Sequence, residues 1–244
     1  MISKNDTKRI NQFQQKKFRY KEGVFIAETP KVVEEFLIAG FVRKYWFATD
    51  SYEVPKGIQG EPVRISPAEM KGISRLETAN TVLAVFEMPT VESIQMEGRV
   101  LALDGVRDPG NMGTIIRLAD WFGMDEVWIS EDCVDIWNPK VVQSSMGSLA
   151  RVRPKICHLP DAVSTFVSEG GKAYVADMDG ESHYSVNWAS DCVLIMGNEG
   201  VGPSDELVEL SKNVVSIPRF GEHGPESLNV AMATGILLAE INRP

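Results

Sequence analysis

The 244-residue chain has few of the residues that build metal centres and disulfide frameworks. It contains three cysteines and three histidines, which are scattered and show no metal-ligand or disulfide spacing. The cysteines are Cys133, Cys157 and Cys192. We therefore expect no zinc or other metal site, and we interpret the cysteines as small core residues.

Long apolar runs are also missing. No stretch of 18 or more apolar residues occurs, so no membrane span is expected. The polar and basic residues 1–20 contain no apolar signal-peptide segment. The sequence therefore predicts a cytoplasmic protein with no membrane partner.

Positive charge is in short supply, because 25 lysines and arginines face 34 acidic residues and leave a net charge of −9. Taken alone, this balance argues against nucleic-acid binding. It hides an asymmetry, however, since residues 4–21 are strongly basic and contain a single acid, Asp6. Two interpretations stay open, a solvated helix face or a footprint for phosphate groups.

The order of predicted elements indicates an α/β protein in two parts. Residues 1–92 show a basic helix at 4–18, strands at 24–28, 44–50, 62–66 and 81–88, and helices that begin at Thr29-Pro30 and at a Ser66 capping box. Residues 99–244 alternate strands and helices. The strands are expected at 99–106, 126–130, 172–178, 191–198 and 213–219, and the helices at 112–122, 138–149, 160–169, 203–211 and 227–241. This alternation predicts a mostly parallel sheet with helices on both faces.

Three strand ends of the second part are unusually rich in glycine and polar residues, namely 104–113, 196–206 and 217–229. In a sheet of this kind, ligands bind beyond the carboxyl ends of the strands. The stretch 197–202 reads G-x-x-G-x-G rather than the dinucleotide motif G-x-G-x-x-G, and Asn111-Met112 stands where a P-loop needs Lys and Ser/Thr. The loops therefore predict a shared site for a ligand other than a dinucleotide or ATP.

Five polar residues in these loops, or one turn into the helix that follows, are the candidates for that site. They are Asn111, Arg117, Glu199, Ser227 and Asn229. Asn111 is expected to cap or orient the helix that follows it, and Arg117 to project from this helix. Each residue alone also has an ordinary explanation, such as a surface ion pair for Arg117. Asn229 lies in an otherwise apolar helical stretch, where a buried amide needs partners. A helix N-terminus that faces the loops can present both Ser227 and Asn229 to a ligand.

The motifs N-x-G-x-x-x-R (111–117), G-N-E-G-x-G (197–202) and I-P…S-L-N-V-A (217–231) together resemble those of the SpoU branch of the SPOUT RNA methyltransferases, over residues 99–242. Residues 15–40 are similar to the substrate-binding domain that often precedes it. The resemblance implies S-adenosylmethionine as cofactor, methylation of a ribose 2′-hydroxyl in tRNA or rRNA, a deep trefoil knot, and a homodimer with a composite active site. It also implies an RNA substrate-binding domain at 1–92 and a methyltransferase domain at 99–244.

The resemblance assigns roles to particular residues. The catalytic set is Arg117, Asn111, Glu199, Ser227 and Asn229. The cofactor set is Met196, Gly197, Asn198, Gly200, Gly202, Ile217 and Leu228. The RNA-binding set is Lys4, Lys8, Arg9, Lys16, Lys17 and Arg19. The stretch between Ile217 and Leu228 is longer and more charged than the family pattern, which leaves the roles of Glu222 and His223 open.

Methyl transfer from a sulfonium to a sugar oxygen needs alignment of the reacting atoms and removal of a proton. The resemblance makes Arg117 the candidate base, although a guanidinium is normally always protonated. Our hypothesis is that Arg117 acts electrostatically, by holding an RNA phosphate and lowering the pKa of the 2′-hydroxyl. Two other functions stay open: an inactive RNA-binding protein of the same fold, and a methyltransferase that acts on a base nitrogen.

Overall fold

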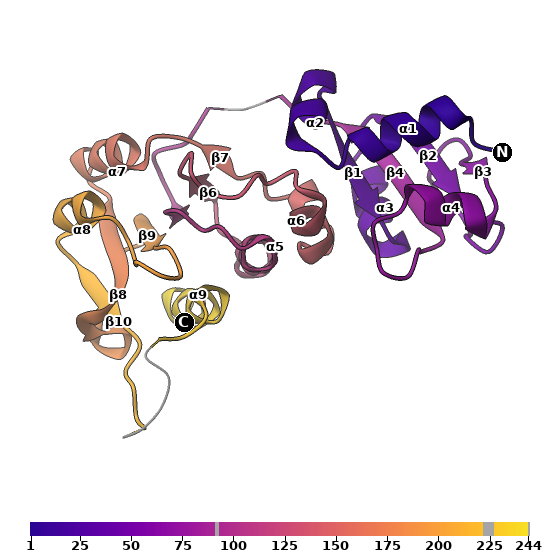
Figure 1. The fold of residues 1–244 in the computed structure, drawn as a ribbon. Helices are drawn as coiled ribbons and strands as arrows, with labels where there is room; N and C mark the ends of the chain where they lie inside the picture. The colour runs from indigo at the N-terminus through magenta and orange to yellow at the C-terminus, as the bar shows by residue number, and fades with distance from the viewer. Residues whose placement is uncertain (91–92, 222–226, 244) are drawn as a thin grey trace. The chain divides into compact units, whose positions relative to one another are not determined.

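The structure is a computed structural model that describes residues 1–90, 93–221 and 227–243. The chain forms two compact units (Figure 1). The first comprises Met1–Thr90 and Asp135–Arg151, and the second comprises Val91–Val134 and Val152–Pro244. No helix in the described ranges is both long and apolar enough to cross a lipid bilayer.

The first unit contains a four-stranded sheet in the order β1-β4-β2-β3. Its strands are β1 (Val24–Glu28), β2 (Arg43–Ala48), β3 (Val63–Arg64) and β4 (Val82–Glu87). Strand β4 pairs antiparallel with both β1 and β2, whereas β3 runs parallel to β2. The helices are α1 (Lys4–Gln12), α2 (Lys16–Glu22), α3 (Pro30–Ile38) and α4 (Pro67–Ile73). The strand predictions for this part are confirmed.

Local signals in the first unit were right in two places and wrong in one. The predicted capping box at Ser66 is present, with reciprocal bonds to Glu69. The predicted single helix at 4–18 is instead the two helices α1 and α2. Helix α3 begins at Thr29-Pro30 as predicted, with Thr29 as its N-cap, although the Thr29 side chain forms no capping hydrogen bond and its φ is 74°.

Residues 135–151 complete the core of the first unit, although they lie far along the sequence. They contain α6 (Pro139–Ser144), which begins at Asn138 as predicted. The Trp137 ring stacks on Phe25 of β1 with centroids 4.4 Å apart. Arg19 of α2 forms an ion pair with Asp135, and the Tyr20 hydroxyl donates to the same carboxylate at 2.8 Å. This segment is therefore part of the fold of the N-terminal unit.

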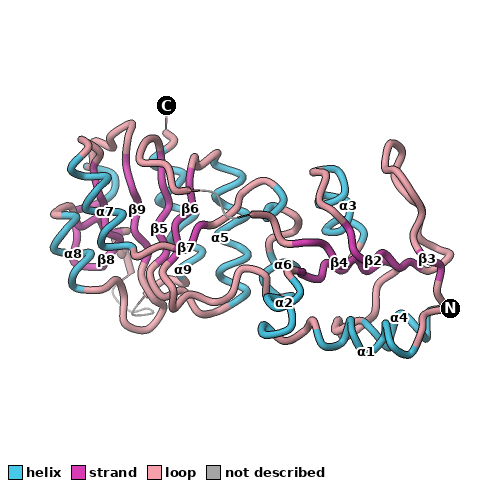
Figure 2. Tube along the Cα trace, turned by 90° about the horizontal axis from the view of Figure 1, so that it is seen from above, coloured by secondary structure: helices cyan, strands magenta, loops and turns pink. Residues whose placement is uncertain are grey.

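The second unit is built on a six-stranded sheet in the order β10-β8-β9-β5-β6-β7, and every neighbouring pair is parallel. Figure 2 shows β8, β9, β5 and β6 side by side. The strands are β5 (Arg99–Leu103), β6 (Glu126–Ile129), β7 (Lys155–Ile156), β8 (Lys172–Ser182), β9 (Cys192–Met196) and β10 (Val214–Ser216). The parallel sheet is confirmed, and β7 is a strand that the sequence analysis missed.

Helices cover both faces of this sheet, with α7 and α8 on one side and α5 and α9 on the other (Figure 1). They are α5 (Pro109–Phe122), α7 (Leu159–Ser168), α8 (Asp205–Ser211) and α9 (Val230–Ile241). Strand β9 is fully buried, because each of its faces packs against a helical layer. The predicted α/β layering is confirmed, while the trefoil knot stays a prediction. The loops with unusual composition all follow the carboxyl ends of these strands.

Candidate active site

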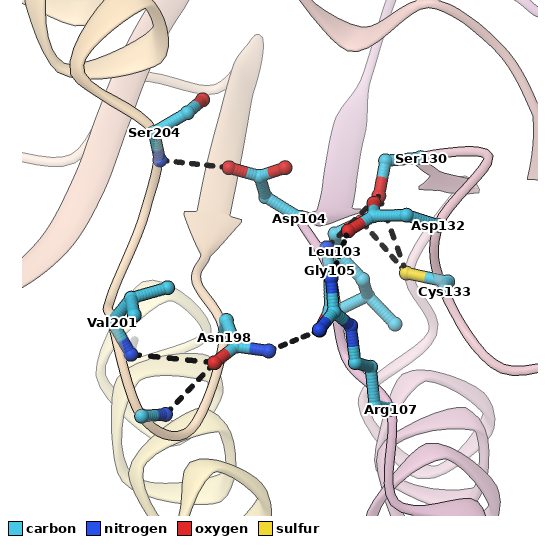
Figure 3. A network of polar contacts seen from close by, with 11 residues as sticks. Leu103, Asp104, Gly105, Arg107, Ser130, Asp132, Cys133, Asn198, Val201 and Ser204 are labelled. Atoms are coloured by element: carbon cyan, nitrogen blue, oxygen red, sulfur yellow. Dashed lines mark hydrogen bonds and ion pairs between the residues drawn. The ribbon is translucent and has the colours of Figure 1, made fainter.

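The loops that follow β5 and β9 are tied to each other by side chains (Figure 3). The Asn198 amide nitrogen donates to the Gly105 carbonyl at 2.6 Å, and the Asp104 carboxylate accepts from the Ser204 amide at 2.8 Å. The Asn198 side-chain oxygen accepts from the amides of Gly200 and Val201. The side chain of Asn198, predicted as a cofactor residue, is therefore occupied in holding the two loops together.

Gly197 makes the tight return of the second loop possible. A Cβ atom at this position would lie 2.0 Å from the Pro203 nitrogen and 2.3 Å from the Gly202 carbonyl carbon. These are backbone atoms, so a side chain there has no soft neighbour to displace. The glycine predicted for its closeness to a ligand is required first by the fold of its own loop.

Three of the five predicted catalytic residues meet in one hydrogen-bonded chain. The Asn111 amide nitrogen donates to Glu199 Oε1 at 3.0 Å, and the Asn229 amide nitrogen donates to Asn111 Oδ1 at 2.9 Å. Each residue comes from a different one of the three strand-end loops. The Asn111 amide is thus fixed from both sides, and one oxygen of the Glu199 carboxylate has a defined donor.

Two local predictions about this chain of residues were wrong. Asn111 does not cap α5; Asp108 does, through a bond of 2.8 Å from the Asn111 backbone amide to its carboxylate. Asn229 is not buried, although it does lie at a helix N-terminus as predicted. It is the exposed N-cap of α9, and its oxygen accepts from the amides of Ala231 and Met232. Both asparagines therefore stand at the starts of helices.

Arg117 does not join this cluster. It lies six residues beyond Asn111 on α5, which corresponds to about 9 Å along the helix axis. Its side chain is exposed and forms no hydrogen bond or ion pair with any residue in the described ranges. Ser227 is also exposed, two residues before Asn229.

The predicted cofactor residues line the same edge of the sheet. Met196 is the buried last residue of β9, and Ile217 follows β10. Leu228 precedes the N-cap of α9 and leaves half of its surface exposed. The other members of the set belong to the loop of residues 197–202. Glu222 and His223 lie outside the described residues.

The predicted RNA-binding residues divide into three groups. Lys4, Lys8, Lys16 and Lys17 are exposed on α1 and α2. Arg9 is partly exposed and pairs with Glu22 at 2.6 Å. Arg19 was predicted wrongly, because its side chain is 2% exposed and its guanidinium is taken up by Asp135 and by the carbonyls of Phe13 and Gln14.

A brace that was not predicted from the sequence joins the loops after β5 and β6 (Figure 3). The Gly105 amide donates to Ser130 Oγ at 2.9 Å, and this hydroxyl donates to Asp132 Oδ1 at 2.6 Å. Arg107 Nη2 lies 3.1 Å from Asp132 Oδ2. The Ser130 hydroxyl and the Arg107 guanidinium lower the pKa of Asp132. The available signal was Ser130-Glu131-Asp132, which follows another strand of the same edge.

Comparison with known proteins identifies the family to which the chain is similar. The SpoU rRNA Methylase family matches residues 98–239, and an MRM3-like substrate binding domain matches residues 4–84. The 23S rRNA (guanosine(2553)-2′-O)-methyltransferase RlmP of Bacillus subtilis is 32% identical over 226 residues, which cover 91% of this chain and 90% of that protein.

Solved structures agree with this assignment over nearly the whole chain. A structure from Porphyromonas gingivalis, assigned to the TrmH family of RNA methyltransferases, has a TM-score of 0.88 and 37% identity and covers 99% of this chain and 98% of its own. The AdoMet-bound rRNA methyltransferase of Sinorhizobium meliloti has a TM-score of 0.85 and 27% identity, with coverage of 99% and 95%.

The chain therefore belongs to the SpoU rRNA methylase family. It is an S-adenosylmethionine-dependent RNA methyltransferase of the 2′-O-ribose class, as the resemblance of its three motifs predicted. Within the described ranges, no group of three or more metal-ligating side chains is present.

Proposed function

We propose that this enzyme methylates a ribose 2′-hydroxyl of ribosomal RNA, with residues 1–92 binding the RNA and residues 99–244 transferring the methyl group. The observation that carries the proposal is the hydrogen-bonded chain of Glu199, Asn111 and Asn229, which joins three distant loops at one edge of the sheet. The Bacillus subtilis relative, named for a guanosine of 23S rRNA, supports ribosomal rather than transfer RNA because it spans nearly the whole chain.

The residues at this edge fit S-adenosylmethionine, which supplies a methyl group already activated by a positively charged sulfur. The exposed Glu199 carboxylate offers the negative charge that such a cation requires nearby. Leu228 presents apolar surface, and Gly200 and Gly202 leave backbone uncovered by side chains. The strand ends at this cofactor site are formed by Met196, Gly197 and Ile217.

The residues of this chain align the ribose 2′-hydroxyl with the methyl group and lower its pKa, and the hydroxyl proton passes to solvent water as the oxygen–methyl bond forms and the methyl–sulfur bond breaks. Asn111, fixed by Glu199 and Asn229, and Ser227 beside them orient the ribose oxygen toward the methyl group. Arg117 holds an RNA phosphate and stabilises the negative charge that develops on the 2′-oxygen. This electrostatic role uses the guanidinium in its ordinary protonated state.

The place of Arg117 supports a composite site in a homodimer. It shares the exposed face of α5 with Trp121, whose side chain is 83% exposed. On α9 the exposed large apolar residues are Met232 and Ile236, and the two helices pack on each other where Gly235 meets Leu118. An exposed apolar surface of this kind is typical of a subunit interface. In such a dimer, Arg117 enters the site of the partner subunit.

The direct test of the proposed function uses the whole protein with isotopically labelled S-adenosylmethionine. Ribosomal RNA and transfer RNA from cells lacking the protein are incubated with it, digested to nucleosides and analysed by mass spectrometry. The expected product is one 2′-O-methylated nucleoside from ribosomal RNA. A methylated base, labelling of transfer RNA alone or no labelling would each contradict the proposal.

The exposed lysines of α1 and α2 are expected to dominate RNA affinity. Replacing Lys8, Lys16 and Lys17 together by alanine removes phosphate contacts, so RNA binding at low salt should weaken by about tenfold or more and depend less on salt. Fluorescence anisotropy with labelled RNA over a salt series measures both effects. A control with Lys56, Lys172 and Lys212 replaced should bind as the wild type does. Equal losses in the two triple variants would contradict the footprint.

Trp121→Glu is expected to convert the dimer to a monomer. A buried interface cannot accommodate an unpaired carboxylate without a large cost. Light scattering coupled to size-exclusion chromatography measures the mass, and methylation should be lost with the dimer because the site is composite. The control is Ile38→Glu, at an apolar residue 69% exposed in the first unit, which should stay dimeric. A dimeric Trp121→Glu protein would exclude this interface.

A further inference from the structure

The loop between β5 and α5 carries an exposed cation whose position is set by a brace. Arg107 is 70% exposed, and its Nη2 contacts Asp132 Oδ2 at 3.1 Å. The other oxygen of Asp132 accepts from Ser130 Oγ at 2.6 Å. The carboxylate that orients Arg107 is therefore itself held in place.

The brace is built into the backbone of the loop. Gly105 has a φ of +68°, and a Cβ atom there would lie 3.1 Å from Asp132 Oδ2. Its amide donates to Ser130 Oγ, and its carbonyl accepts from Asn198. The same glycine thus connects the brace to the loop of residues 197–202. An exposed ion pair adds little stability, so the fixed geometry points to a role in orienting the guanidinium.

Several N–H donors of the Arg107 guanidinium remain available for a ligand. Its contact with Asp132 engages Nη2 alone, and no other bond of this side chain is formed within the described ranges. A guanidinium binds a phosphate group through several N–H donors at once, and it binds with less loss of freedom when its position is already set.

Arg107 also supplies positive charge at a site whose loops are acidic. The surrounding loops carry the acidic residues Asp104, Asp108 and Glu199, and the whole chain has a net charge of −9. RNA brings one negative charge for each nucleotide, so the ribose cannot reach these loops without cations close to them. Arg107 stands four residues before Asn111, in the loop directly before Asp108, the N-cap of α5.

We propose that Arg107 is a substrate-positioning residue that binds an RNA phosphate next to the ribose being methylated, with Asp132, Ser130 and Gly105 setting its orientation. This inference rests on the proposed function, because it concerns the RNA of that same reaction. It predicts that Arg107 acts on RNA binding and alignment and leaves S-adenosylmethionine binding unchanged.

The test compares Arg107→Ala, Arg107→Lys and Asp132→Asn in the full chain, with Lys172→Ala as a control at an exposed lysine of the same unit. Steady-state kinetics with ribosomal RNA over a salt series gives KM and kcat, and calorimetry gives the affinity for S-adenosylmethionine. For Arg107→Ala we expect KM for RNA to rise about tenfold, with the slope of log KM against log salt reduced by about one. Arg107→Lys should keep the slope and lose part of the affinity.

Asp132→Asn separates positioning from a purely structural role. It breaks the ion pair but keeps the cation, so we expect KM for RNA to change much less than in Arg107→Ala. Equal defects in the two variants, or weakened S-adenosylmethionine binding in Arg107→Ala, would show that the pair only shapes the loop and would overturn the proposal. An unchanged KM in Arg107→Ala would overturn it as well. Failure of the proposed function is distinct, since the wild type would then methylate no ribosomal RNA.

Discussion

Arg117→Lys is expected to lower the rate of methyl transfer by about 10²–10³-fold, the cost of removing one well-placed donor from a developing oxyanion. Lysine keeps the positive charge but not the planar fork that holds a phosphate and a neighbouring oxygen together. Single-turnover kinetics with saturating RNA and labelled S-adenosylmethionine measures the effect. The affinity for S-adenosylmethionine should stay close to the wild-type value, since Arg117 forms no hydrogen bond or ion pair with the described residues of the loops assigned to the cofactor.

A matched exchange at a remote position controls for this variant. Arg243 lies beyond the end of α9, is 61% exposed and pairs with Glu240. Arg243→Lys should methylate at the wild-type rate. Near-normal turnover in Arg117→Lys would remove the special role of the guanidinium, and a parallel loss of S-adenosylmethionine affinity would assign Arg117 to cofactor binding instead.

Arg19→Ala is expected to destabilise the protein by about 3–5 kcal/mol, because it leaves the carboxylate of Asp135 buried without its cation. Both side chains of the pair are almost completely buried, at 2% and 6% exposure. The carbonyls of Phe13 and Gln14 lose their donor as well. Urea unfolding followed by tryptophan fluorescence measures the change, because tryptophans lie in both units and two of them, Trp46 and Trp137, lie in the first.

Lys17→Ala is the control on the same helix, and its exposed side chain predicts a change within about 0.5 kcal/mol. In RNA binding the order of the two variants should reverse. Lys17→Ala should weaken RNA affinity more than Arg19→Ala does, because Lys17 contributes to binding directly. A loss of less than about 1 kcal/mol in Arg19→Ala would mean that the pair adds no more than an exposed one does.

Much of the second unit could be predicted because its signals are local. Strands buried on both faces appear as apolar runs, and parallel strands bring their carboxyl ends to one edge. This rule was sufficient to predict that Asn111, Glu199 and Asn229 belong to one site. The cap of α5 was also within reach, since Pro109 at the first helical position marks Asp108 as the N-cap.

Other predictions failed because tertiary contacts, and not local sequence, determine the structure at those positions. The charge of Arg19 is visible in the sequence, but its burial depends on Asp135, which lies 116 residues away. The strand β7 has only two residues and no pattern of its own. The place of 135–151 in the first unit depends on Trp137 meeting Phe25, which no periodicity in either segment indicates.

The path of the chain limits how this enzyme can be divided into stable fragments. It leaves the first unit after Thr90, returns at Asp135 and departs again after Arg151. A fragment ending at residue 92 would lack the ring that covers Phe25 and the carboxylate that neutralises Arg19, whereas a fragment starting at residue 99 would carry Trp137, Val141 and Val142 with nothing to cover them. A protease that nicks the chain near residue 92 should leave two pieces that elute together until denaturant is added.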